Sequence, residues 1–153
     1  MLVVSDTSPI SALLQIGRAE LLEKLFGTVC IPPAVNDELI RFHSALPTFI
    51  DVRVVFDQAR VKSFLNQLDL GEAEAIVLAA ESNADYLLID ERRGRKAASE
   101  AGVPIIGLVG VILLAKSRGL ISTVKTLLNE LQASAGFYID DLLLQKALDA
   151  AGE

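Results

Sequence analysis

The chain has 153 residues, 52% of them hydrophobic, which is enough to bury one substantial core and gives no sign of a second. Its 14 Lys and Arg against 20 Asp and Glu give a net charge of -6, so any binding of nucleic acid must be local. The single cysteine, Cys30, excludes an internal disulfide, and no apolar stretch is long enough to span a bilayer. We therefore expect one domain, residues 1–153, in the reducing cytoplasm and without a membrane partner.

Short apolar runs rich in Val and Ile alternate with longer segments of helical period. This pattern is typical of βαβ units and of a parallel sheet. It predicts strands near residues 2–5, 28–31, 86–89 and 104–107, with weaker candidates at 52–55 and 137–139. Because crossovers between parallel strands are right-handed, the residues that follow these strands are expected at one edge of the sheet.

Helical periodicity fills the segments between the strands. Ser8 followed by Pro9 predicts an N-cap and a first helical residue, whereas Gly102 with Pro104 beyond it predicts a helix end. The expected helices cover residues 9–16, 18–25, 33–42, 57–67, 69–82, 92–101, 109–118, 121–133 and 140–151.

Isolated carboxylates stand where these elements meet turns. Asp6 follows the first strand, Asp90 follows the strand near 86–89, and Glu38 and Glu72 lie on two helices. Each has an ordinary structural explanation. Asp6 and Asp90 could cap the helices that follow them, Glu72 has capping-box spacing with Asp69, and Glu38 could be a solvated helix residue.

The joint pattern favours a metal site over four separate structural roles. An apolar strand that ends in Asp, twice in one parallel sheet, presents both acids to one crevice. Carboxylates with no His or Cys beside them favour Mg²⁺ or Mn²⁺ over Zn²⁺. Such ions stabilise charge on a phosphoryl oxygen, so the pattern indicates phosphodiester hydrolysis.

Other features of the sequence are weaker. Arg92, Arg93, Arg95 and Lys96 form the one dense basic cluster, and its position after Asp90 favours contacts with phosphate over a merely solvated helix face. No Gly-rich phosphate loop is present. The single His43 has no evident partner and is expected at the surface.

Taken together, the motifs resemble the PIN domain family, and more closely its VapC-type toxins of the branch with a Leu-Asp-x-Gly-Glu-Ala-Glu-Ala signature. The resemblance covers essentially the whole chain. The segments that carry it are 4–9, 31–35 with Glu38, 68–75, 88–95, 110–116 and 119–121.

This resemblance implies a three-layer α/β/α sandwich with a central parallel sheet and a Mg²⁺- or Mn²⁺-dependent endoribonuclease activity. It implies that Asp6, Glu38, Glu72 and Asp90 form the catalytic and metal-binding cluster. Thr7 or Ser8 would be a polar supporter of these acids. From their positions beside the acids, we expect Thr7, Ser8, Arg92, Arg93 and Arg95 to bind substrate. The family also implies a small antitoxin as partner and a homodimer.

One departure from the family pattern leaves a ligand open. Many members have a single Asp where this chain has Glu72 and, two residues later, Glu74. These two side chains point about 200° apart on a helix, and the apolar stripe favours Glu72 as the metal-side acid. The alternatives to a ribonuclease are a non-hydrolytic RNA-binding or protein-interaction module with a degenerate fold, and a small-molecule phosphatase.

Overall fold

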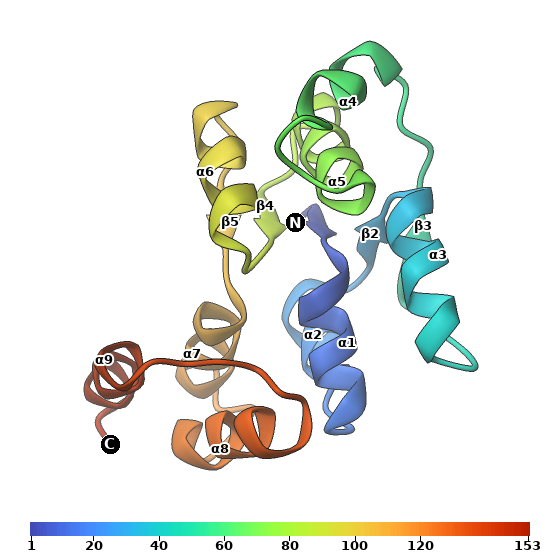
Figure 1. Ribbon diagram of the computed structural model, residues 1–153. Coiled ribbons are helices and arrows are strands. Elements are labelled where there is room, and N and C mark those ends of the chain that lie inside the picture. Colours follow the sequence, from blue (N-terminus) through green and yellow to red (C-terminus); the bar gives the residue numbers. More distant parts are fainter.

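The computed structural model describes residues 1–153, and its centre is one parallel sheet of five strands (Figure 1). The strand order is β3-β2-β1-β4-β5. The chain moves outward from β1 to β3 and then returns to pair β4 with the other side of β1, so the order reverses between β1 and β4. In sheets of this kind ligands bind outside the carboxyl ends of the strands at that reversal. The strands are β1 (Val3–Ser5), β2 (Val29–Ile31), β3 (Ile50–Val52), β4 (Tyr86–Leu88) and β5 (Ile105–Ile106).

Helices cover both faces of the sheet, which confirms the expected three-layer α/β/α sandwich. Figure 1 shows α4, α5 and α6 on one face, and α1, α2, α7 and α8 on the other. The helices are α1 (Thr7–Gln15), α2 (Glu20–Phe26), α3 (Pro33–Phe42), α4 (Gln58–Phe64), α5 (Leu70–Glu81), α6 (Arg92–Glu100), α7 (Leu108–Ser117), α8 (Val124–Ser134) and α9 (Asp141–Ala151). None of them has the length and apolar character needed to cross a membrane.

The two faces of the sheet hold two separate hydrophobic cores. Val3 and Leu88 belong to the core beneath α1, α2, α7 and α8, whereas Val4 and Leu87 belong to the core beneath α5 and α6. Successive strand side chains point to opposite faces, so a strand covered on both sides is apolar at every position. This burial explains the continuous apolar runs of the sequence.

Several expected boundaries were wrong. Residues 137–139 form no strand but lie in the connection between α8 and α9, where Phe137 and Ile139 pack on the core without a strand partner. The strand expected at 52–55 occupies 50–52, and the helix expected from residue 121 begins at Val124, after Thr123 as N-cap.

The first helix also begins earlier than expected. Its N-cap is Asp6 rather than Ser8, and Asp6 makes no side-chain capping bond to the helix.

Candidate active site

Asp6 lies at the reversal of strand order, between β1 and the start of α1. Its backbone N–H donates to the carbonyl of Leu88 at 2.9 Å, so the end of β1 is tied to the end of β4. The residue is only 4% exposed. Burial raises the pKa of Asp6 to about 7, the N–H of Thr7 opposes this shift, and the charges of Asp69, Glu38 and Glu91 add to it. A carboxyl buried among other acids, with no capping duty of its own, is typical of a functional site.

Glu72 is the second buried acid, on the first turn of α5. It forms the predicted capping box with Asp69: Asp69 Oδ1 accepts from the Glu72 N–H at 2.8 Å, and Glu72 Oε1 accepts from the Asp69 N–H at 3.4 Å. Burial raises the pKa of Glu72 to about 7, and Asp69 and Asp6 add to the shift. The capping role is therefore real, yet Glu72 also interacts electrostatically with Asp6.

Glu38, on α3, reaches the same group of acids. Its Oε2 accepts a short hydrogen bond from the Thr7 hydroxyl, the residue next to Asp6. Glu38 is half-buried, and its charge contributes to the raised pKa of Asp6. The solvated helix position considered for Glu38 is thus not what the fold provides.

Asp90 follows β4 and turns toward the start of α7. Its Oδ1 accepts from the Leu108 N–H at 3.0 Å, whereas its Oδ2 is buried and has no hydrogen-bond partner. Burial raises the pKa of Asp90, although Leu108 and the Arg95 guanidinium act in the opposite direction. Asp90 does not cap the next helix α6, whose N-cap is Glu91. A buried carboxylate oxygen without a partner is costly and marks a place for a cation or a water.

Three glycines leave room for three of these acids. A Cβ on Gly71 would lie 2.7 Å from Glu38 Oε1, one on Gly94 would lie 2.8 Å from Glu72 Oε2, and one on Gly107 would lie 2.9 Å from Asp90 Oδ1. Contacts this short do not occur at real Cβ atoms. The backbone of α5, of α6 and of the turn between β5 and α7 therefore approaches the carboxylates so closely that only glycine fits.

Glu74 has a different environment from Glu72. It is 8% exposed, and its Oε1 accepts from the Ala34 N–H at 2.9 Å. Ala34 lies in the first turn of α3, where the backbone N–H groups have no partner within the helix. Glu74 therefore caps a neighbouring helix, which favours Glu72 as the acid that faces Asp6.

Two acids near Asp6 were not among the predicted site residues. Glu91 raises the pKa of both Asp6 and Asp90, and Asp69 raises that of Asp6 and Glu72. Asp90 itself is not among the charges that shift the pKa of Asp6. In the sequence, the position of Glu91 directly after Asp90 was the feature that could have identified Glu91 as a further acid of the site.

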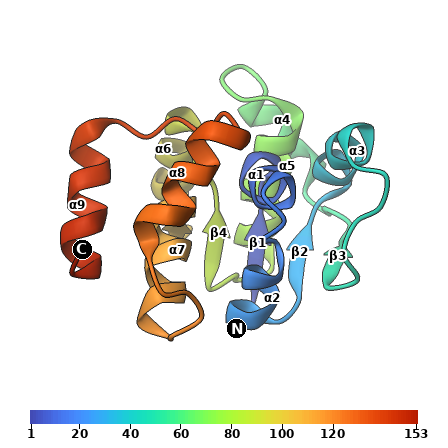
Figure 2. The same ribbon diagram turned by 90° about the horizontal axis from the view of Figure 1, so that it is seen from below.

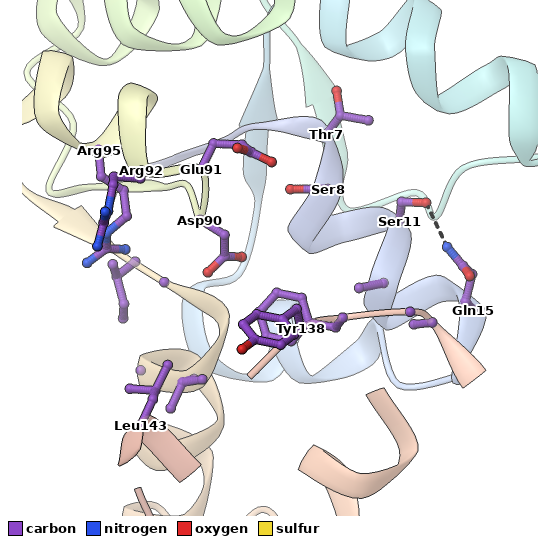
Figure 3. A pocket seen from close by; sticks show the side chains of 18 of the residues that line it. Thr7, Ser8, Ser11, Gln15, Asp90, Glu91, Arg92, Arg95, Tyr138 and Leu143 are labelled. Atoms are coloured by element: carbon purple, nitrogen blue, oxygen red, sulfur yellow. Dashed lines mark hydrogen bonds between the residues drawn. The ribbon is translucent and has the colours of Figure 1, made fainter. Parts of the chain in front are cut away.

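Of the four predicted acids, only Asp90 lines a pocket, which has a volume of about 980 Å³ (Figure 3). Thr7 and Ser8 from α1, Asp90, Glu91 and Arg92 are among the residues around it. The predicted substrate-binding arginines differ in their surroundings. Arg92 and Arg93 are exposed, and of these two Arg92 lines the pocket whereas Arg93 does not. Arg95 also lines it, but its Nη1 donates to the Ile89 carbonyl at 2.9 Å, so its guanidinium supports the loop that carries Asp90.

The expectation that His43 has no partner was wrong. Its Nε2 lies 3.0 Å from Ser11 Oγ, in a half-buried contact that ties the end of α3 to α1. The two residues are 32 positions apart, so no local pattern could have shown the contact.

Comparison with known families shows the family to which the chain belongs. A profile described as the PIN domain matches residues 2–153. The chain belongs to the PIN domain family. PIN domains are typically nucleases, which supports a nuclease kind of function and a nucleic-acid substrate for this one. A search of curated proteins found no match.

PIN domain nucleases generally use divalent metals, and the donor set of this PIN domain fits such an ion in its chemistry. The available ligands are carboxylate oxygens, as Mg²⁺ and Mn²⁺ prefer, and Asp90 Oδ2 has no competing partner. As the side chains stand, however, no three acids, His or Cys are close enough to hold a metal together. Glu38 and Glu72 are engaged by Thr7 and Asp69 instead. To bind a metal ion, Glu38 and Glu72 would have to give up these hydrogen bonds and turn their carboxylate oxygens toward the ion.

Proposed function

We propose that the protein is a Mg²⁺- or Mn²⁺-dependent endoribonuclease that hydrolyses phosphodiester bonds of RNA. The observation that supports this most strongly is the pairing of β1 with β4, because it brings the strand-end acids Asp6 and Asp90 to adjacent strands at the reversal of strand order. The charge of Glu38 adds to the raised pKa of Asp6, and the charge of Asp6 adds to the raised pKa of Glu72, so both glutamates lie near Asp6. Acids gathered in this way repel one another unless a cation offsets their charge.

In this proposal Asp6 and Asp90 are the core metal ligands, and Glu38 and Glu72 complete the site directly or through water. A bound divalent ion supplies charge stabilisation at a phosphoryl oxygen. The chain's own residues do the rest. Thr7 holds Glu38 in place through its hydroxyl, Arg95 supports the Asp90 loop, and exposed Arg92 offers a cation to a phosphate at the pocket.

The decisive experiment is cleavage of a labelled RNA oligonucleotide with Mn²⁺ added, compared between the parent and Asp6→Asn. We expect the parent to cut internally, EDTA to stop it and Asp6→Asn to be inactive. Mn²⁺ should also raise the Tm of the parent only, because a ligand at a hundred-fold excess over Kd stabilises the folded state by about 2.7 kcal/mol.

Two results would overturn the proposal. Turnover of a small monophosphate without any cleavage of oligonucleotides would indicate a phosphatase. RNA binding with no cleavage in Mg²⁺ or Mn²⁺ would indicate the non-hydrolytic module.

The proposal extends to a biological role as the toxin of a toxin–antitoxin pair in the cytoplasm, acting as a homodimer that a small antitoxin restrains. The resemblance of the motifs at 4–9, 68–75 and 88–95 to VapC-type toxins supports this role. Induced expression of the parent should arrest bacterial growth, whereas Asp6→Asn should not. Light scattering of the purified protein tests the dimer, and growth unaffected by an active ribonuclease would remove the toxin role alone.

A further inference from the structure

The aromatic side chains of this protein are unevenly placed. The chain has six Phe, two Tyr and no Trp, and Phe42, Phe137 and Tyr138 all line the pocket that Asp90 and Glu91 also line. Phe42 comes from the end of α3, and the other two come from the connection between α8 and α9. Figure 2 shows this connection crossing the end of the sheet toward which the strands point. The pocket beside Asp90 and Glu91 therefore has an aromatic rim.

Tyr138 is held on an anchored backbone with its ring in solvent. The side chain is 84% exposed and its hydroxyl makes no hydrogen bond. Its neighbours are anchored in the core: Ile139 is 3% exposed, and Phe137 is partly buried and packs on the core. Gln132 Nε2 also donates to the Ile139 carbonyl at 3.1 Å. The fold thus fixes the chain on both sides of Tyr138 and still presents a large apolar ring to water.

The surroundings of the ring match an RNA strand better than an apolar ligand. Figure 3 shows Tyr138, Ser8 and Asp90 around one opening, with Arg92 at its side. Arg92 is exposed and forms no ion pair. The net charge of -6 provides no general attraction for phosphate, so affinity must come from contacts at this place. Stacking on an aromatic ring supplies such affinity without charge, because every base has a π-face.

We propose that Tyr138 is a base-stacking residue that holds one unpaired nucleobase of the RNA beside the acids, with Arg92 on an adjoining phosphate. This inference rests on the proposed ribonuclease function and adds the subsite that positions its substrate. Phe42, 79% exposed on the same pocket, offers a second face for a neighbouring base. A duplex keeps its base faces covered, so the subsite selects single-stranded or looped RNA.

Binding measured apart from cleavage tests the proposal. The probe is a fluorescent single-stranded RNA oligonucleotide, and its Kd is read by anisotropy in EDTA and, with Mn²⁺ present, in an Asp6→Asn background. We expect Tyr138→Ala to weaken binding about 5- to 150-fold, the range for one stacked base. Tyr138→Phe keeps the ring and should bind nearly as the parent does. Both variants should melt like the parent, because the side chain is exposed.

The chain provides a matched control. Phe56 is 83% exposed but lies beside β3 and α4, in a different pocket from Tyr138. Phe56→Ala should therefore leave RNA binding unchanged. A second probe with abasic positions in place of bases should bind weakly and equally to the parent and to Tyr138→Ala.

The outcomes separate this inference from the function on which it rests. Equal Kd values for the parent and Tyr138→Ala, or equal losses in Tyr138→Ala and Tyr138→Phe, would overturn the stacking role. No measurable binding by the parent would overturn it as well. In each case, Mn²⁺-dependent cleavage by the parent would still uphold the ribonuclease, whereas its absence would overturn both.

Discussion

Glu74 accepts a hydrogen bond from the backbone N–H of Ala34 at 2.9 Å, and this contact joins the middle of α5 to the first turn of α3. Glu72, two residues earlier, is held instead by the N-cap residue Asp69 and interacts with Asp6. The two buried glutamates of one helix thus serve two different neighbours.

This difference predicts opposite effects of one substitution. Glu72→Gln should lose ribonuclease activity with little loss of stability, because Gln can still serve the capping box but is a poor ligand for a hard cation. Glu74→Gln should stay active and lose about 1 kcal/mol of stability, because a neutral acceptor replaces a charged one at a helix N-terminus. Cleavage assays and urea unfolding of both variants provide the comparison; the reverse ranking would move the metal-side role to Glu74.

Stability should fall as the pH rises in the absence of metal. The pKa values of Asp6 and Glu72 rise from 3.8 and 4.5 to about 7 on folding, so between about pH 4 and pH 7 the folded state binds more protons than the unfolded state. Raising the pH through this window therefore lowers the free energy of unfolding. One pKa unit corresponds to about 1.4 kcal/mol, so the loss is on the order of a few kcal/mol.

Asp6→Asn should flatten this profile and make the metal-free protein more stable than the parent at pH 8. Denaturant unfolding in EDTA at several pH values provides the measurement. A parent that gains stability from pH 5 to pH 8 would contradict the expected repulsion.

The arginines after Asp90 should divide into two kinds. Replacing Arg92 and Arg93 together by Ala should weaken RNA binding and flatten its salt dependence. RNA binding with fewer phosphate contacts releases fewer counterions from the RNA. Arg95→Ala should instead lower stability, by about 1–3 kcal/mol, because the Ile89 carbonyl and the buried Asp90 lose their partner. An unchanged salt slope in the double variant would place Arg92 and Arg93 on an ordinary solvated surface.

Gly94→Ala should harm the site although Ala is the better helix former. In an ordinary helix this change adds up to about 1 kcal/mol of stability. Here the new methyl group would meet Ile89 Cδ1 at 2.6 Å and Glu72 Oε2 at 2.8 Å. Overpacking costs about 1–3 kcal/mol, so we expect a net loss, together with lower activity as Glu72 is displaced. A stable and fully active Gly94→Ala protein would show that Glu72 has room to move without consequence.

Topology made the general position of the acids predictable from the sequence. Alternating strands and helices predict a parallel sheet, and a parallel sheet brings the ends of its strands to one edge, so Asp6 and Asp90 could be assigned to that edge in advance. The capping box of Asp69 and Glu72 was equally accessible, because all of its atoms lie within four residues.

Contacts between distant segments were not predictable in this way. Ala34 and Glu74 are 40 positions apart, and Ser11 and His43 are 32 apart, so neither partner has a local signature. The apolar alternation of Phe137 and Ile139 resembles a strand, but these residues bury their side chains without pairing to the sheet. Which of the adjacent acids 90 and 91 raises the pKa of Asp6 likewise depends on the turn into α6, not on the pattern of residues.

The pairing of β1 with β4 also has a consequence during synthesis of the chain on the ribosome. Val3 pairs with Tyr86, so the strands that precede Asp6 and Asp90 become neighbours only through a contact between segments far apart in the chain. A growing chain displays Asp6 and Glu38 on the ribosome well before residue 90 has been added, and contacts of such long sequence separation form late because closing the loop costs entropy. A nascent chain should therefore be inert toward the RNA that surrounds it until the second half of the sheet has been made.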